Sequence, residues 1–125
     1  MNREKFDVDV NAALDSCKHI LITKGREYQS NNDERNTNVF ANFERGANLT
    51  GVQRETVLFI YLSKHWDSIC TFMKDLQSGK GVAEIESKMS EPINGRFMDA
   101  INYLLILNSM VNDKRFDEEI NVNKK

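Results

Sequence analysis

SEPINGRFMDAINYLLILNSMV, residues 90–111, is the stretch that decides the fold of this chain. Ser90, Glu91 and Pro92 are typical of a helix start, because serine caps free N–H groups, an acidic side chain suits the helix dipole and proline is tolerated in the first turn. Apolar residues then recur at three-to-four spacing, which predicts a helix from Glu91 to about Asn112. The predicted core face of this helix consists of Ile93, Phe97, Ile101, Leu104, Leu105 and Val111.

A polar stripe runs beside this apolar face. It consists of Glu91, Gly95, Asp99, Asn102 and Tyr103. A helix can line a buried binding site where polar and apolar faces adjoin. The same pattern is typical of a solvated helix surface, so both interpretations stay open.

The spacing of apolar residues predicts four more helical segments, at about residues 6–23, 38–48, 52–77 and 82–89. Thr50 is expected to cap the third of them, with Gln53 reaching back as in a capping box. The sequence therefore predicts a compact all-α bundle of four to five helices. We expect one domain over residues 1–112 and a loosely held tail over residues 113–125.

The predicted helix over residues 52–77 carries apolar residues on nearly all sides between Val57 and Leu62. Such a helix lies at the centre of a bundle or is shared with a second subunit, so we expect an oligomer through this segment. Its expected seam is Leu58, Leu62, His65, Ile69, Phe72 and Leu76. His65 then lies on the buried side, as a hydrogen-bonded core residue or as a ligand, whereas Trp66 and Asp67 face elsewhere.

Composition limits the classes of partner. A net charge of −2 over 125 residues gives no general attraction to long nucleic acid or to anionic lipid. Cys17 and Cys70 lack metal-ligand and redox spacing, so we expect reduced core thiols. The N-terminus is polar and the longest apolar run is too short to span a bilayer. These features predict a cytoplasmic protein without a membrane partner.

Cations and aromatic residues near the apolar seams favour a pocket for a phosphorylated nucleotide. Arginine and lysine at a pocket edge pair with phosphate oxygens, and an aromatic ring packs on a base. The alternative is that most of these side chains belong to an ordinary surface. The candidate ligand-binding residues are Lys24, Arg26, Tyr28, Arg45, Lys64, His65, Arg96 and Tyr103.

A magnesium site is the second possibility, because hard cations prefer several oxygen ligands close together. Glu91 and Asp99 are roughly 12 Å apart along a helix, too far to share one ion. A metal site would therefore need Glu27 and Glu44 from other segments. Without such a site, no cofactor is expected.

Four segments together resemble a family of small bacteriophage proteins. They are KGREY at 24–28, NVFANFERGANLTG at 38–51, YLSKHWDSI at 61–69 and SEPINGRFMDAINYLLIL at 90–107. They are similar to the nucleotide modification associated domain, an all-helical family loosely akin to MazG-type pyrophosphatases. The likeness covers about residues 20–111, and the SEPINGR-x-x-D-A-I-N-Y segment is its most specific part.

The resemblance implies a nucleotide-linked function in a phage. The family's middle-helix cation falls on Lys64, and its acidic ladder falls on Glu91 and Asp99. Gly95 stands where the family has the middle acid, which makes metal-dependent hydrolysis the second choice.

Three functions are therefore considered. The first is a phage protein in the host cytoplasm that holds a phosphorylated nucleotide or a nucleotide-derived signal, with an anti-defence sponge as one version. The second is a magnesium-dependent nucleoside triphosphate pyrophosphatase with Glu27, Glu44, Glu91 and Asp99 as ligands. The third is a non-enzymatic module that blocks a host protein and is indifferent to Lys64→Ala.

Overall fold

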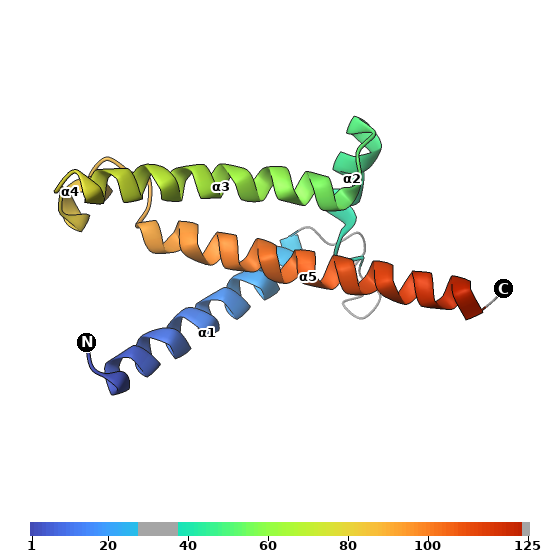
Figure 1. Cartoon of the computed structure of the whole chain (residues 1–125), viewed down its shortest axis with the longest axis horizontal. Coiled ribbons are helices and arrows are strands. Elements are labelled where there is room, and N and C mark those ends of the chain that lie inside the picture. The colour runs from blue at the N-terminus through green and yellow to red at the C-terminus, as the bar shows by residue number, and fades with distance from the viewer. Residues whose placement is uncertain (28–37, 124–125) are drawn as a thin grey trace.

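The structure, a computed structural model, describes residues 1–27 and 38–123, except for the side chains of residues 25–27. This part of the chain forms five helices and no strand: α1 (Arg3–Glu27), α2 (Ala41–Thr50), α3 (Arg54–Gln77), α4 (Val82–Glu86) and α5 (Ile93–Asn123). α3 and α5 lie side by side as an antiparallel hairpin, and α1 crosses α5 (Figure 1). The predicted all-α fold of four to five helices is confirmed.

The core of the hairpin is divided between its two ends. At one end, Leu58 and Val57 of α3 pack with Phe43 of α2 and Met110 of α5. Leu58 and Met110 are both 0% exposed, so this cluster is the best-packed part of the molecule. It joins α5 to α2 and α3, which lie much earlier in the sequence.

At the other end, Phe72 of α3, Ile85 of α4 and Ile93 of α5 form a second cluster. α4 thus closes the hairpin where α3 ends and α5 begins (Figure 1). All six members of the seam predicted on α3 are buried or half-buried, and Trp66 and Asp67 are exposed. The seam predicted on α3 is therefore confirmed.

α5 buries the predicted face only near its start, where Ile93 belongs to the second core cluster and Phe97 packs against it. Ile101, Leu104, Leu105 and Val111 are 38 to 55% exposed. Asn102 is buried instead, because the polar stripe is the side of α5 that meets α1 and α3. The spacing of apolar residues defines an apolar face, but it does not say which neighbour covers that face.

The ends of α5 also differ from the prediction. The backbone N–H of Ile93 donates a hydrogen bond of 2.7 Å to the Glu86 carboxylate, so the cap comes from α4 and not from Ser90. The helix continues to Asn123, well past the predicted end near Asn112. Residues 113–123 are therefore part of α5, and Lys114 Nζ donates to Gln53 Oε1 at 3.1 Å.

The capping box predicted at Thr50 is wrong. Thr50 is the last residue of α2, and its hydroxyl donates to the Gly46 carbonyl at 2.7 Å. Gly51 then ends α2 with a φ of 77°, a conformation that glycine adopts without strain. α3 begins three residues later, with Gln53 at the cap position and no side chain of the described residues bonded there.

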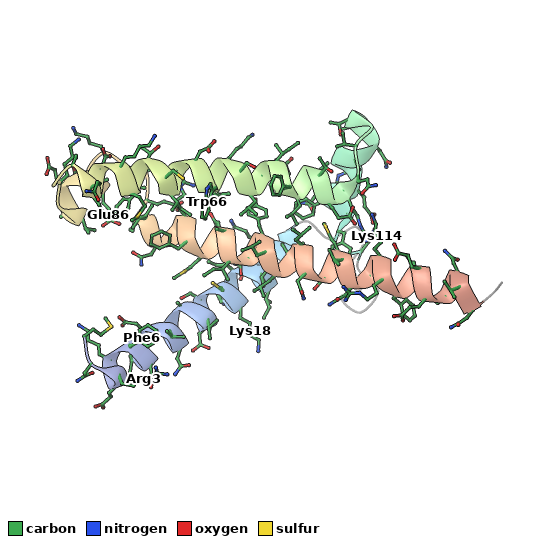
Figure 2. The ribbon with its side chains drawn as sticks, in the orientation of Figure 1. Arg3, Phe6, Lys18, Trp66, Glu86 and Lys114 are labelled. Atoms are coloured by element: carbon green, nitrogen blue, oxygen red, sulfur yellow. The ribbon has the colours of Figure 1, made fainter. Side chains whose placement is uncertain are left out.

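α1 is longer than predicted, and only its C-terminal half packs against another helix. Its C-terminal half packs on α5 through Cys17, which is 2% exposed. Phe6, Val10 and Leu14, which share the helical spacing of Cys17, are 48, 38 and 55% exposed. Figures 1 and 2 show the reason, because the N-terminal end of α1, which bears Phe6, points away from the hairpin. Within residues 1–27 and 38–123, no helix has the length and apolarity needed to cross a bilayer.

Gly46 allows α2 to approach α3 closely. A Cβ at this position would lie 2.9 Å from Cγ1 of the buried Val57. We expect Gly46→Ala to lower the free energy of unfolding by about 1 kcal/mol, because overpacking outweighs the gain in helix propensity. Gly95→Ala is the matched control, since a Cβ there meets only the carboxylate end of Glu91, which can move. Urea unfolding in which Gly46→Ala is at least as stable as Gly95→Ala would contradict the prediction.

Candidate functional site

A cavity of about 350 Å³ lies between the C-terminal part of α1, the start of α2 and the middle of α5. Its volume is within the range of about 300–1,000 Å³ that is typical of small-molecule sites. The walls are mainly apolar and include Leu21, Phe40, Phe43 and Ile106. Three helices therefore enclose a space with the character of a ligand pocket.

α5 brings the polar groups to this cavity. Asp99, Asn102 and Tyr103 line it, because residues three or four apart share one side of a helix. α1 adds Lys24 from its last turns. Three members of the polar stripe predicted on the central helix thus line this cavity, whereas Glu91 at the start of the stripe is exposed.

Asn102 is the most unusual group in the cavity. It is 5% exposed, and neither its Nδ2 nor its Oδ1 has a hydrogen-bond partner among the described residues. Leaving a buried amide unpaired costs about 1–3 kcal/mol. The side chain offers both a donor and an acceptor, so it is complementary to a ligand that presents both.

Asp99 links the cavity to α3. Its Oδ1 lies 3.8 Å from Lys24 Nζ, and its Oδ2 lies 3.6 Å from Nδ1 of His65. The Lys24 side chain is 60% exposed, so its contact with Asp99 is weak and its ammonium group is available to an anion. Nδ1 of His65 is buried without a hydrogen-bond partner in the described part of the chain.

Tyr103 belongs to an aromatic cluster beside the cavity. Its ring stacks on Tyr61 at a centroid distance of 6.4 Å, meets the edge of Phe43 at 6.4 Å and lies 5.2 Å from His65. Such contacts fix the ring orientation. Tyr103 therefore forms a preorganised wall between the cavity and α3.

Cys17 is held in its thiol form. Burial, and then the negative charge of Asp99, raise the pKa of the Cys17 thiol. A thiol with a raised pKa is a poor nucleophile. Cys17 and Cys70 are both free, as expected, and Cys17 serves as a packing residue of α1.

The other predicted ligand residues do not line the cavity. Arg45 is exposed on α2, and Lys64 is exposed on α3 with its Nζ 5.8 Å from the Tyr61 ring centroid. Arg96 is paired with Glu91 at 3.1 Å. Tyr28 and the Arg26 side chain lie outside the described residues. Of the predicted ligand residues, Lys24 and Tyr103 thus line the cavity, and His65 lies beside it, in contact with Asp99 and Tyr103.

The carboxylates proposed for magnesium are engaged separately. Glu44 accepts a hydrogen bond of 2.9 Å from Arg54, Glu91 pairs with Arg96, and Asp99 contacts Lys24. Among the side chains described, no group of three or more His, Cys, Asp or Glu residues could hold a metal ion. The Glu27 side chain lies outside this part, so the magnesium alternative stays a prediction.

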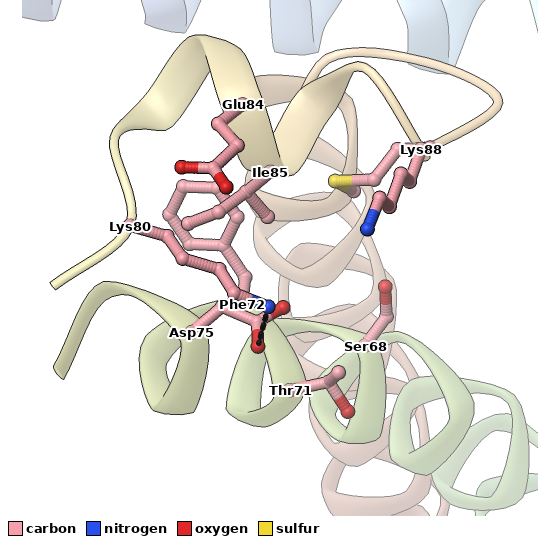
Figure 3. Close-up of a pocket in the computed structure, with 9 residues that line it drawn as sticks. Ser68, Thr71, Phe72, Asp75, Lys80, Glu84, Ile85 and Lys88 are labelled. Atoms are coloured by element: carbon pink, nitrogen blue, oxygen red, sulfur yellow. Dashed lines mark ion pairs between the residues drawn. The ribbon is translucent and has the colours of Figure 1, made fainter. Parts of the chain in front are cut away.

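A second cavity, of about 330 Å³, lies between α3 and α4 (Figure 3). Lys80 and Lys88 reach into it, and Lys80 Nζ lies 3.7 Å from Asp75. Both lysines are exposed, and none of the buried unpaired atoms of the described residues belongs to its lining. The α1–α2–α5 cavity is therefore the stronger candidate site.

Sequence reasoning placed Asn102 in the polar stripe but not among the ligand residues. Its position three residues after Asp99 and next to Tyr103 was the available signal. What the sequence lacked was the packing of α1 over α5, which buries the amide.

Comparison of the chain with protein-family models, with curated protein sequences and with solved structures finds no match. The resemblance to the nucleotide modification associated domain therefore stays a prediction.

Proposed function

We propose that this protein binds a nucleotide or a nucleotide-derived signal in the cavity between α1, α2 and α5. The observation that carries the proposal is Asn102, whose buried amide has an unused donor and an unused acceptor. An asparagine amide forms paired hydrogen bonds with the edge of a purine base. Phe40 and Phe43 offer apolar ring surface for the base, and Lys24 offers a cation for the phosphate.

Binding without hydrolysis is the favoured form of this activity. Glu44 and Glu91 are engaged in ion pairs with Arg54 and Arg96, so each would have to leave its arginine to join Asp99 around a metal ion. The proposed biological role is that of a phage protein that sequesters a nucleotide signal in the host cytoplasm. We also propose that it works as a homo-oligomer, which is supported by the exposure of Phe59 and Ile60 on α3.

The test is calorimetric titration of the full chain with mononucleotides and cyclic dinucleotides. We expect Asn102→Leu to abolish binding of the ligand that the wild type selects, because the paired hydrogen bonds are lost. The same substitution should raise the free energy of unfolding of the ligand-free protein by about 1–2 kcal/mol, since it removes an unpaired buried amide. A merely structural asparagine would not combine lost binding with increased stability.

Asn108→Leu is the matched control, because Asn108 is an exposed asparagine on the same helix. It should leave binding unchanged. Lys24→Ala should weaken the binding of the phosphorylated ligand and leave the binding of the corresponding nucleoside unchanged. The proposal fails if no nucleotide gives a heat of binding on titration, or if the Asn102→Leu variant binds the selected nucleotide as tightly as the wild type.

A further inference from the structure

The protein exposes more surface than a globular monomer of its mass. Its accessible surface is 9442 Å² for 14.4 kDa. A monomer of this mass is expected to expose about 6,800 Å². The difference, about 2,600 Å², is close to the upper end of the roughly 1,000–2,500 Å² that each partner buries in an obligate homodimer.

Part of the exposed surface is apolar and lies along α3. Phe59, Trp66 and Met73, here called the α3 stripe, recur at seven-residue intervals and are 60, 59 and 52% exposed. A seven-residue interval places them on one side of the helix, as in a coiled-coil seam. Leu62, Ile69 and Leu76, at the alternate seam positions, are half-buried. One edge of the seam is therefore packed within the chain, and the other edge has no cover from the described residues.

The N-terminal half of α1 also exposes apolar side chains that no other described residue covers. Every residue from 3 to 12 is exposed, although the segment carries Phe6 and Val10 on the helical face that is buried farther along. A short helix without tertiary contacts is marginal in water. The exposed apolar face of α5, which includes Ile101 and Leu104, adds a third uncovered stripe.

We infer that a second copy of this chain covers the α3 stripe, in a homodimer whose central contact is this stripe. A two-fold dimer uses the same patch of both subunits, and a helix with an apolar seven-residue repeat is self-complementary. The stripe carries no charge that would select an oppositely charged partner. The surplus area is also what one subunit of a permanent dimer buries.

The first test is the mass of the full chain in solution. Sedimentation at micromolar concentration should give twice 14.4 kDa for the wild type and 14.4 kDa for the Phe59→Lys, Trp66→Lys double variant. Leu49→Lys is the matched control, because Leu49 is an apolar residue on α2 that is 87% exposed, and it should remain dimeric. Circular dichroism should show helix in all three proteins, since none of the substituted side chains is in the core.

The second test uses Trp66, the only tryptophan of the chain. Its fluorescence should shift to longer wavelength on dilution, as the dimer separates and water reaches the indole ring. The labelled position of Trp66 on α3 is shown in Figure 2. A wild-type chain that sediments as a monomer, or a double variant that assembles as the control does, would overturn the proposal.

Discussion

Replacing Arg54 by methionine is expected to lower the free energy of unfolding by about 2–3 kcal/mol. Arg54 is the first residue of α3, its side chain is 18% exposed, and its guanidinium donates to Glu44 at 2.9 Å, Glu55 at 3.3 Å and Asp113 at 2.8 Å. Removal leaves three neighbouring carboxylates without their shared cation. The cost is below the roughly 3–5 kcal/mol of a fully buried pair because Glu44 and Asp113 are partly solvated.

Arg45→Met is the control for Arg54→Met. Arg45 is an exposed arginine on α2, so its replacement should change the free energy of unfolding by less than about 0.5 kcal/mol. Urea unfolding at one fixed protein concentration measures both variants. Equal losses in the two variants would show that the carboxylate cluster does not depend on Arg54.

The cluster also predicts the pH dependence of stability. Burial opposes the charge of Glu55, but hydrogen bonds from its own backbone and from Arg54, together with the charges of Lys114 and Arg54, lower the pKa of its carboxyl group below the ordinary 4.5. A carboxyl group whose pKa is lowered by folding stabilises the protein above its ordinary pKa. That contribution is lost as the pH falls below about 4.5, and the loss should be smaller in Arg54→Met.

The second large effect is expected for Leu58→Ala, which should lower the free energy of unfolding by about 3–4 kcal/mol. Leu58 is 0% exposed and packs between Phe43, Val57 and Met110. Truncation removes buried methyl groups and leaves a cavity, because three helices hold the surrounding side chains in place. The loss is measured by urea unfolding at fixed protein concentration, since assembly shifts apparent stability.

Leu49→Ala is the matched control for Leu58→Ala. Leu49 is 87% exposed at the end of α2, so its truncation should cost less than about 0.5 kcal/mol. A difference between the two variants smaller than about 1 kcal/mol would show that the Leu58 cluster is not the centre of the core.

The sequence predicted α3 well because its seam is packed within the same chain. Leu58 and Phe72 face α5, as helical spacing requires, and Trp66 lies outside. On α5 the same spacing was right only for Ile93 and Phe97, because Ile101 and Leu104 farther along belong to an apolar face that is largely exposed. Periodicity records which residues avoid water, and it does not distinguish a neighbour in the same chain from one in another subunit.

The candidate site was predicted in part. Lys24, Tyr103 and Asp99 were recognised as chemically useful residues, and the structure places them at one cavity. Asn102 was missed as a ligand residue because its burial depends on α1 crossing α5. The predicted cap of α5 was wrong for a related reason, because the group that caps this helix is Glu86 on another helix.

The hairpin of α3 and α5 is pinned at both ends. Glu86 bonds to the start of α5 at one end, and Arg54 joins α3 to Asp113 at the other. The two long helices therefore cannot move apart about a hinge without breaking one of these two hydrogen bonds. α1 is held less firmly, because it rests mainly on α5 and its ion pair with that helix, between Lys24 and Asp99, is long at 3.8 Å. We therefore expect α1, and not the hairpin, to move when a small molecule enters or leaves the cavity.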